Sequence, residues 1–280
     1  MSDFPAEPLV AQAAIVGGGP AGLMAAEVLA RAGVQVDVFD AMRSVGRKFL
    51  LAGKGGLNLT HSEPMAQFAA RFGARRAVME PLLHAFPPAA VRDWAQGLEI
   101  GTFVGSSGRV FPADMKAAPL LRAWLHRLRT MGVRFHMRQR CTGVAAGDDG
   151  RLTLQFISPA GPVQARADAV VLALGGASWP QLGGDGAWAS WLPGLGADVA
   201  PLQASNCGFD VARAGAGATL LPGWSEHMSS RFAGHALKTV ALSVASADGS
   251  QVQQRGEFVI THGGVEGSLI YAASAVLRST

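Results

Sequence analysis

The sequence predicts an α/β fold in which a mostly parallel sheet with helices is followed by a second, β-containing domain. Residues 13–40 read AAIVGGGPAGLMAAEVLARAGVQVDVFD, which is a short apolar strand, a glycine cluster, a helical pattern and a strand that ends in an acid. This order is typical of the first βαβ unit of a Rossmann-like domain. Residues 169–174 (AVVLAL) form a continuous apolar run, which indicates a strand buried on both faces of a parallel sheet. From residue 191 short strands and Gly/Pro/Ser-rich loops take over, so we place the domains at 1–190 and 191–280.

The glycine cluster has the G-x-G-x-x-G spacing of a dinucleotide-binding loop. Gly17 permits the tight turn from strand to helix, Gly19 lets a pyrophosphate approach the backbone, and Gly22 lets the helix pack closely on the strand. Pro20 and Ala21 open the helix within the same loop. The free N–H groups at this positive end of the helix favour an anion.

Asp40 ends the second strand, 18 residues past Gly22. A carboxylate at this position can accept hydrogen bonds from a ribose 2′-hydroxyl, and it would repel a 2′-phosphate. The strand, loop, helix and acid together predict a dinucleotide site. The alternative is a turn that needs its glycines for backbone geometry alone.

The patterns between residues 41 and 168 are mixed. Residues 41–61 are glycine-rich and basic without a clean period, which predicts an ordered loop. Residues 101–112 indicate a hairpin with Gly-Ser-Ser-Gly at its tip, and residues 116–131 have apolar residues at helical spacing. We also expect helices over 74–86 and 89–98, strands over 133–137, 141–146, 152–157 and 163–166, and a turn at 147–150.

This layout argues against an ordinary nicotinamide dehydrogenase, in which βα units follow one another at short intervals. Here the next parallel-type strand is expected only near Ala169, after a basic loop, helices and an antiparallel meander. No second glycine fingerprint follows a strand. We therefore expect one tightly bound dinucleotide, and any second nucleotide must bind by other means.

Composition narrows the function classes further. A chain of 280 residues with 49% hydrophobic and 16% charged residues is globular, and no apolar run is long enough to span a bilayer. The first residues (MSDFPAEPLVAQ) lack the basic stretch and apolar core of a secretory signal. Cys141 and Cys207 form no C-x-x-C motif, and their spacing does not imply a structural disulfide. We therefore expect a cytoplasmic protein without a membrane partner. The net charge of +4 is spread along the chain, which favours solvated helix faces over a nucleic-acid surface. The seven histidines show no metal-ligand spacing, so no metal site is expected.

Several segments resemble the HI0933-like flavoproteins. These are bacterial FAD-binding proteins described as NAD(P)/FAD-dependent oxidoreductases, with some relatives described as aminoacetone oxidases. The resemblance covers almost the whole chain. Its most specific parts are the basic glycine loop GRKFLLAGKGGLNLT (46–60) and the turn ALGGASWP (173–180). The other segments are GGGPAGLMAA (17–26), GRVFPADMK (108–116), SNCGF (205–209) and GEFVITHGGVEGSLIY (256–271).

The resemblance implies FAD as cofactor, with NAD(P)H as a possible transient electron donor. By that analogy the glycine loop holds the pyrophosphate, Asp40 holds the adenosine ribose, and the backbone near Val144 meets the adenine. Arg47 and Lys48 would lie beside the cofactor, and Gly175 and Gly176 would pass beneath it. The flavin side would be lined by Gly53, Gly55, Gly56, Asn58 and Thr60.

The residue types at these positions are also compatible with simple structural roles. Arg47 and Lys48 fit exposed loop charges, and Asn58 and Thr60 fit local turn capping. The pair Gly175-Gly176 fits a plain turn after a strand. By resemblance, family members extend past the GSLIY segment and return to the first domain with a last flavin contact. Because the sequence stops at Thr280, we expect that contact and part of the substrate domain to be missing.

The leading hypothesis is an FAD-dependent oxidoreductase that moves a hydride between bound flavin and a small organic substrate or NAD(P)H. Three alternatives stay open: a nucleotide-binding remnant without turnover, an NAD-dependent dehydrogenase, and an RNA-modifying flavoprotein acting on tRNA. No catalytic residue is assigned, since His61, Cys207, Lys238 and Glu266 fit solvated or structural roles. Trp179 and Pro180 are expected to shape the pocket wall. The sequence sets no oligomeric state.

Overall fold

The computed structural model describes residues 9–52, 55–215, 219–245 and 251–279. The chain forms two compact units that divide between Ala200 and Pro201. The short 3₁₀ turn η4 (Leu192–Leu195), which follows residue 190, therefore lies with the first unit. The role of residues 191–280 as a substrate domain stays a prediction.

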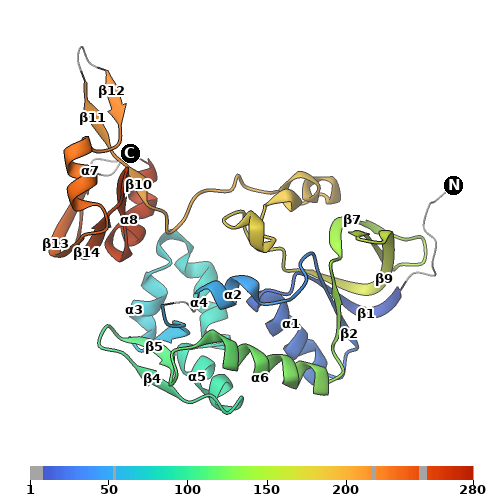
Figure 1. Cartoon of the computed structure of the whole chain (residues 1–280). Helices are drawn as coiled ribbons and strands as arrows, with labels where there is room; N and C mark the ends of the chain where they lie inside the picture. Colours follow the sequence, from blue (N-terminus) through green and yellow to red (C-terminus); the bar gives the residue numbers. More distant parts are fainter. Residues whose placement is uncertain (1–8, 53–54, 216–218, 246–250, 280) are drawn as a thin grey trace. The chain divides into compact units, whose positions relative to one another are not determined.

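The first unit is built on a six-stranded sheet in the order β6-β2-β1-β9-β8-β7 (Figure 1). The first four strands in this order run parallel, and β8 and β7 continue the sheet from β9 as an antiparallel meander. This is the predicted Rossmann-like α/β domain with a β-meander. The strands are β1 (Leu9–Val16), β2 (Val36–Asp40), β6 (Arg134–Met137), β7 (Arg140–Ala146), β8 (Leu152–Ser158) and β9 (Gly161–Leu172).

Strand β6 corrects one expectation. It pairs parallel with β2, with Asp37 opposite Arg134, so a parallel strand arrives long before residue 169. Sequence analysis missed this direction because a four-residue strand carries no buried run that marks a parallel sheet. The strand order up to β6 is therefore compatible with a nicotinamide dehydrogenase as well.

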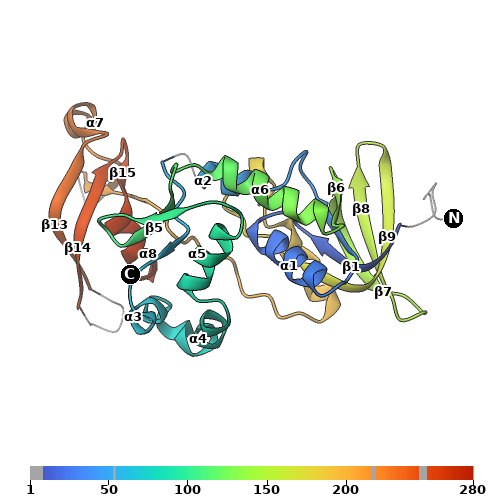
Figure 2. The ribbon, with the colours of Figure 1, turned by 90° about the horizontal axis from the view of Figure 1, so that it is seen from below.

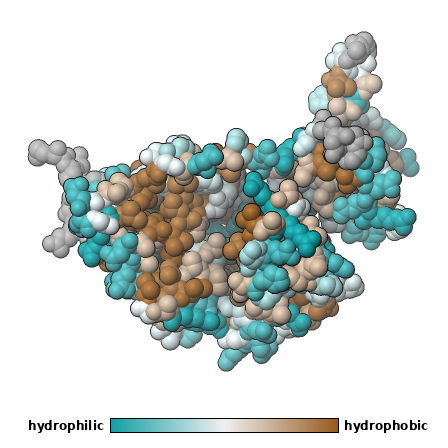
Figure 3. Space-filling view, turned by 180° about the vertical axis from the view of Figure 1, so that it is seen from behind, coloured by the Kyte–Doolittle hydropathy of each residue, from teal (hydrophilic) through white to brown (hydrophobic). Residues whose placement is uncertain are grey.

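Strand β9 corrects a second expectation. The two strands predicted over 163–166 and 169–174 are one strand, whose first half pairs with β8 and whose second half pairs with β1. Residues 169–172 have β1 as their neighbour on one side and no β8 residue on the other. Both faces of the stretch are covered in part: Val171 packs on the core under the helices and Val170 on the core of the meander, whereas Leu172 is 36% exposed. Apolar residues reach the surface of this unit over a broad area (Figure 3).

Two helices cover one face of the parallel strands. Helix α1 (Pro20–Arg31) and helix α6 (Ala117–Thr130) lie side by side there (Figure 2). The alternation of β1 points Ile15 toward these helices, whereas Ala14 and Val16 pack on the opposite face with the meander. The predicted helix over 116–131 is confirmed, and its residues Leu120, Leu121, Trp124 and Leu128 are buried.

A buried carboxylate joins α1 to two other helices. Glu27 is 1% exposed and accepts hydrogen bonds from Trp94 Nε1 (3.0 Å), Trp124 Nε1 (2.6 Å) and Arg127 Nη1 (2.9 Å). It also pairs with Arg31 on its own helix. Burial alone would raise the pKa of Glu27, but the hydrogen bonds from the indoles and Arg127 outweigh it and lower the pKa. Glu27 therefore stays charged and fixes α1 to α5 (Pro88–Gln96) and α6.

The segment between β2 and α6 is more regular than predicted. Residues 41–61 contain α2 (Arg47–Ala52) and β3 (Thr60–His61) in place of an uninterrupted loop. The predicted hairpin is confirmed as β4 (Thr102–Val104) and β5 (Arg109–Pro112), which form a small sheet with β3. The remaining helices are α3 (Met65–Ala70), η1 (Gly73–Arg75) and α4 (Arg76–Ala85).

The second unit is a small α+β assembly. Its four-stranded antiparallel sheet has the order β10-β15-β14-β13, and α8 packs against β14, β13 and β15. A two-stranded ribbon, β11 with β12, and helix α7 complete it. The elements are β10 (Phe209–Asp210), β11 (Ala212–Ala214), β12 (Leu220–Pro222), α7 (Glu226–Phe232), β13 (Ala236–Ala245), β14 (Gln251–Ile260), β15 (Gly264–Glu266) and α8 (Ser268–Ser279).

Candidate dinucleotide site

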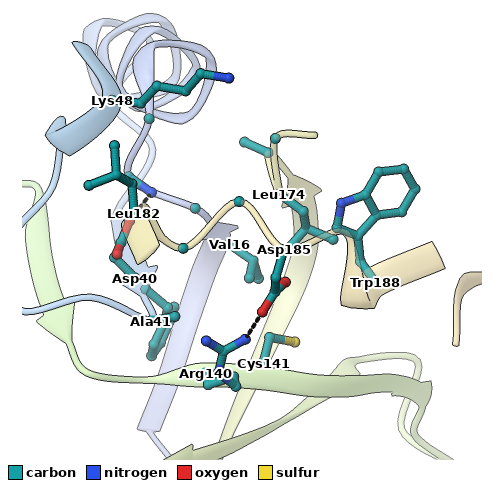
Figure 4. A pocket seen from close by; sticks show the side chains of 18 of the residues that line it. Val16, Asp40, Ala41, Lys48, Arg140, Cys141, Leu174, Leu182, Asp185 and Trp188 are labelled. Atoms are coloured by element: carbon teal, nitrogen blue, oxygen red, sulfur yellow. Dashed lines mark hydrogen bonds and ion pairs between the residues drawn. The ribbon is translucent and has the colours of Figure 1, made fainter. Parts of the chain in front are cut away.

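A groove crosses the carboxyl ends of β1, β2 and β9 (Figure 4). The chain leaves β1 toward β2 on one side, and β9 lies on the other side, so the groove sits where the strand order reverses. Open α/β sheets bind ligands at such a switch point. The groove holds about 1000 Å³ including its open mouth. Its lining comes from the glycine loop, the end of β2, the start of α2, the start of β7 and residues 173–191: Val16, Gly17, Gly18, Gly19, Pro20, Phe39, Asp40, Ala41, Ser44, Gly46, Arg47, Lys48, Gln139, Arg140, Cys141, Ala173, Leu174, Gly175, Gly176, Leu182, Gly183, Gly184, Asp185, Ala187, Trp188 and Trp191.

The three fingerprint glycines have separate geometric reasons to lack a side chain. Gly17 has a φ of +109°, and a methyl group added there would lie 2.2 Å from the carbonyl oxygen of Ala173. A methyl group on Gly22 would lie 1.9 Å from the carbonyl oxygen of Gly17. Gly19 faces open space, with nothing within 4 Å of such a group. Gly17 and Gly22 thus shape the loop, whereas Gly19 keeps the backbone open to a ligand at the start of α1.

Asp40 stands at the end of β2 beside this loop. Its Oδ2 accepts a hydrogen bond from Gly18 N at 2.7 Å, which Figure 4 draws, and its Oδ1 accepts one from Met42 N at 2.7 Å. Burial raises the pKa of Asp40, although these backbone N–H groups and the nearby Arg47 oppose that rise. Each carboxylate oxygen retains a lone pair for a hydroxyl donor.

Helix α2 brings two cations to the groove. Gly46 N donates to Gly18 O at 2.8 Å, which joins the start of α2 to the glycine loop. Arg47 and Lys48 follow, and both line the groove. Lys48 Nζ donates to Ser178 Oγ at 2.6 Å, so α2 is also joined to the segment after β9.

Residues 176–191 form one wall of the groove. They contain the 3₁₀ turns η2 (Pro180–Leu182) and η3 (Ala187–Ser190), and η4 (Leu192–Leu195) follows. Arg140 Nη1 donates to Asp185 Oδ2 at 2.6 Å and so links the start of β7 to this wall (Figure 4). Trp179 and Pro180, which were expected to shape the wall, do not line the groove; Leu182, Trp188 and Trp191 do.

The groove gathers polar atoms that have no protein partner. In the described residues, buried side-chain nitrogen or oxygen atoms without a hydrogen bond occur at Arg47 Nε, Gln139 Oε1 and Trp188 Nε1. All three residues line the groove. Buried polar groups are normally paired, because an unpaired one costs free energy. These two donors and one acceptor therefore fit a polar ligand in this groove.

The structure brings together some of the predicted site residues. Gly17, Gly19, Pro20, Asp40, Arg47, Lys48, Gly175 and Gly176 line the groove, and Ala21 and Gly22 lie behind them in the first turn of α1.

Other predicted positions lie elsewhere. Thr60 belongs to β3 and pairs with β5. In the chain before it, Leu59 N donates to Val110 O on β5, and Leu57 N donates to Met115 O, three residues past the end of β5. Val144 packs in the meander core. The residues that the structure does not bring to the groove are Gly55, Gly56, Asn58, Thr60 and Val144, and Gly53 lies outside the described residues.

Sequence reasoning missed the start of β7. Gln139, Arg140 and Cys141 line the groove because Gln139 N donates to Asp40 O at 2.9 Å. The available signal was the strand over 133–137: placed parallel beside β2, it ends next to Asp40. Residues 139–141 thus line the groove, and the adenine contact near Val144, which lies outside it, stays a prediction.

The remaining reactive candidates lie outside the groove. His61 Nδ1 accepts from Glu63 N at 3.1 Å, and its Nε2 lies 3.0 Å from Ser107 O, so both ring nitrogens are engaged. Cys207, Lys238 and Glu266 belong to the second unit. Across the described ranges, no cluster of three or more His, Cys, Asp or Glu residues is arranged to hold a metal ion.

The family model of the HI0933-like protein Rossmann domain matches residues 11–276. The chain belongs to the HI0933-like family. Among curated proteins, the sequence has no match. Within its described residues, this HI0933-like chain contains no helix with the length and hydropathy of a membrane span.

Solved structures resemble the HI0933-like chain in fold. The 3-ketosteroid-Δ4-(5α)-dehydrogenase from Rhodococcus jostii matches 68% of this chain and 55% of its own, with 19% identity and a TM-score of 0.50. Quinol fumarate reductase from E. coli matches 61% of this chain and 34% of its own, with 20% identity and a TM-score of 0.48. The chain thus spans about half of the dehydrogenase and about a third of the reductase. The likeness to the dehydrogenase shows that the two proteins share a fold over this part of the chain.

Proposed function

We propose that this protein is an FAD-dependent oxidoreductase that transfers a hydride between bound flavin and a small organic substrate or NAD(P)H. The observation that carries the proposal is the groove itself. It combines an open glycine loop at the start of α1, an acid at the end of β2 and unpartnered polar atoms on its walls. A cytoplasmic location and the absence of a nucleic-acid or membrane partner belong to the same proposal.

Successive residues along the groove fit successive parts of an adenine dinucleotide. Backbone N–H groups beside Gly19 would hold the diphosphate, and Arg47 would balance its charge. Asp40 would accept from the ribose 2′-hydroxyl, and its charge disfavours a 2′-phosphate, which favours FAD or NAD over NADP at this position. Trp188 would donate its buried indole N–H to the ligand. When bound, FAD would supply the redox chemistry, and the protein would position it.

Purified protein is expected to show flavin absorption bands, either as isolated or after reconstitution with FAD. We expect titration to give tighter binding of FAD than of NAD, and NADH, NADPH or an amine to bleach the flavin bands. Tight binding of NAD without affinity for FAD would support a nicotinamide dehydrogenase. Bound FAD that no donor reduces would support a remnant without turnover. Protein without affinity for either coenzyme would contradict the proposal.

Replacing Asp40 by Asn is expected to weaken FAD binding by roughly tenfold, because the hydrogen bond to the ribose loses its charge. The amide oxygen can still accept from one of the two backbone N–H groups, Gly18 N or Met42 N, but the NH2 group would face the other, so urea unfolding of the variant is measured beside the titration. The matched control is Asp168→Asn on β9, where the carboxylate pairs with Arg151 away from the groove. Dissociation constants from fluorescence titration check the prediction, and equal affinity in Asp40→Asn and wild type would contradict it.

A further inference from the structure

Residues 176–185, which we call the strap, follow β9 and border the groove. The strap contains η2, and a bridge between Trp179 and Gly184 folds it back on itself. In the described residues, its backbone hydrogen bonds all lie within the strap, and none joins it to another strand or helix. None of its residues is buried. A segment with so few backbone bonds to its surroundings and so little buried surface can open without the rest of the fold.

Two glycines flank the strap with left-handed backbone conformations. Gly175 has a φ of +71° and Gly186 a φ of +70°. A methyl group built on Gly175 would meet no atom within 4 Å, so the chain between β9 and the strap turns in open space. Glycine rotates about its backbone more freely than any other residue, so these two positions can absorb the rotation of a hinge.

The strap reaches across the end of β1. It starts after β9, and a methyl group built on Gly183 would lie 3.0 Å from Met42 Cγ, in the chain that leaves β2. Because β1 lies between β2 and β9 in the sheet, a segment that joins these two ends crosses the carboxyl end of β1, where the glycine loop begins. The strap residues that line the groove are Gly176, Leu182, Gly183, Gly184 and Asp185.

Two side-chain bonds, which we call the tethers, hold the strap to other elements of the groove. Lys48 Nζ on α2 donates to Ser178 Oγ at 2.6 Å, and Arg140 Nη1 at the start of β7 donates to Asp185 Oδ2 at 2.6 Å (Figure 4). The side chains of Arg140 and Asp185 are 46% and 32% exposed, so water competes for this pair. Both tethers can therefore break while the sheet stays intact.

We propose that the strap is a lid on the dinucleotide groove: its tethers break and re-form, and its opening sets the rate at which a dinucleotide enters and leaves. The ligand in this inference rests on the proposed function, whereas the opening belongs to the chain without ligand. Cys141 can report the opening, because it lines the groove directly after the tethered Arg140. Cys207 lies in the second unit and serves as the internal reference.

The first test measures alkylation of both thiols by N-ethylmaleimide in the full chain without ligand, followed by mass spectrometry. Ser178→Ala and Asp185→Asn each remove one tether, and each is expected to speed alkylation of Cys141 about threefold, because exposed pairs contribute little. The double variant is expected to speed it about tenfold, because the effects of separate bonds add. Cys207 is expected to react at the wild-type rate in every variant.

Two controls leave both tethers in place. Ser190→Ala removes a hydrogen bond inside η3, and Asp168→Asn removes the charge of an exposed ion pair on β9 outside the groove. Both are expected to keep the wild-type alkylation rate of Cys141. Faster alkylation in Asp185→Asn without any in Ser178→Ala would come from the charge lost near the thiol and would overturn the inference.

The second test follows the release of FAD by stopped-flow fluorescence. The double variant is expected to release FAD about tenfold faster than the wild type, because opening of a lid limits the exit of its ligand. A wild-type rate of FAD release in this variant, or a wild-type rate of Cys141 alkylation, would overturn the inference alone. Failure of FAD to bind the wild type would overturn the proposed function, and the alkylation rates would still show whether the strap opens.

Discussion

Replacing Gly22 by Ala is expected to abolish FAD binding and to lower the free energy of unfolding by about 3 kcal/mol. Alanine normally stabilises a helix relative to glycine by roughly 1 kcal/mol. Here the added methyl group would lie 1.9 Å from Gly17 O and 3.2 Å from Ile15 Cγ2. The nearer atom belongs to the backbone and cannot rotate away, so α1 must move off β1 and open the glycine loop. Urea unfolding and FAD titration of the variant measure the two effects.

Gly19→Ala is the matched control for this expectation. Its methyl group meets nothing within 4 Å in the protein, and the residue lines the groove. This variant is expected to unfold like the wild type and to bind FAD at least tenfold more weakly, because the methyl group occupies the approach to the diphosphate. Wild-type stability and affinity in Gly22→Ala would show that the loop does not need the close contact of α1 with β1.

Replacing Glu27 by Ala is expected to lower the free energy of unfolding by about 3 kcal/mol. The substitution leaves two indole N–H groups and the Arg127 guanidinium without the carboxylate that they share, and the Trp124 indole is fully enclosed. We place the loss at the lower end of the range for buried ion pairs, because the side chain of Arg127 is 20% exposed and that of Arg31 is 58% exposed. Denaturant unfolding followed by tryptophan fluorescence measures the loss.

The control for this variant is Glu80→Ala, whose partner Arg76 lies one helical turn away on the surface of α4. Exposed pairs of this kind contribute less than about 1 kcal/mol. Glu27 does not line the groove, so folded Glu27→Ala protein is expected to bind FAD with wild-type affinity. A loss below 1 kcal/mol in Glu27→Ala would mean that water replaces the carboxylate among its donors.

The first βαβ unit could be predicted because its signals are local. The fingerprint glycines, the apolar strand and Asp40 lie within one short stretch, and each has a backbone or charge requirement that the residue type reveals. The amphipathic helix over 116–131 was visible for the same reason. In contrast, α2 spans residues 47–52, too short for a helical period to appear in a glycine-rich stretch.

The far wall of the groove could not be predicted, because it depends on pairings between distant strands. Gln139 reaches the groove only because β6 lies parallel to β2. The strand over 133–137 could be predicted, but its partner and direction could not. The flavin-side role of Asn58 and Thr60 stays a prediction that rests on the family motif. The described chain there is bonded to β5 beside Val110 and does not line the groove.

The pairing of β9 with β1 affects how the chain folds during synthesis. Its residue Ala165 pairs with Leu9 on the first strand, so the central sheet joins segments from opposite ends of the first unit. On the ribosome, the opening strand emerges long before its neighbour exists, and such non-local pairing slows folding. Until β9 is synthesised, β1 (LVAQAAIV) leaves one edge of its backbone unpaired and its apolar side chains exposed, the kind of surface that chaperones protect from aggregation.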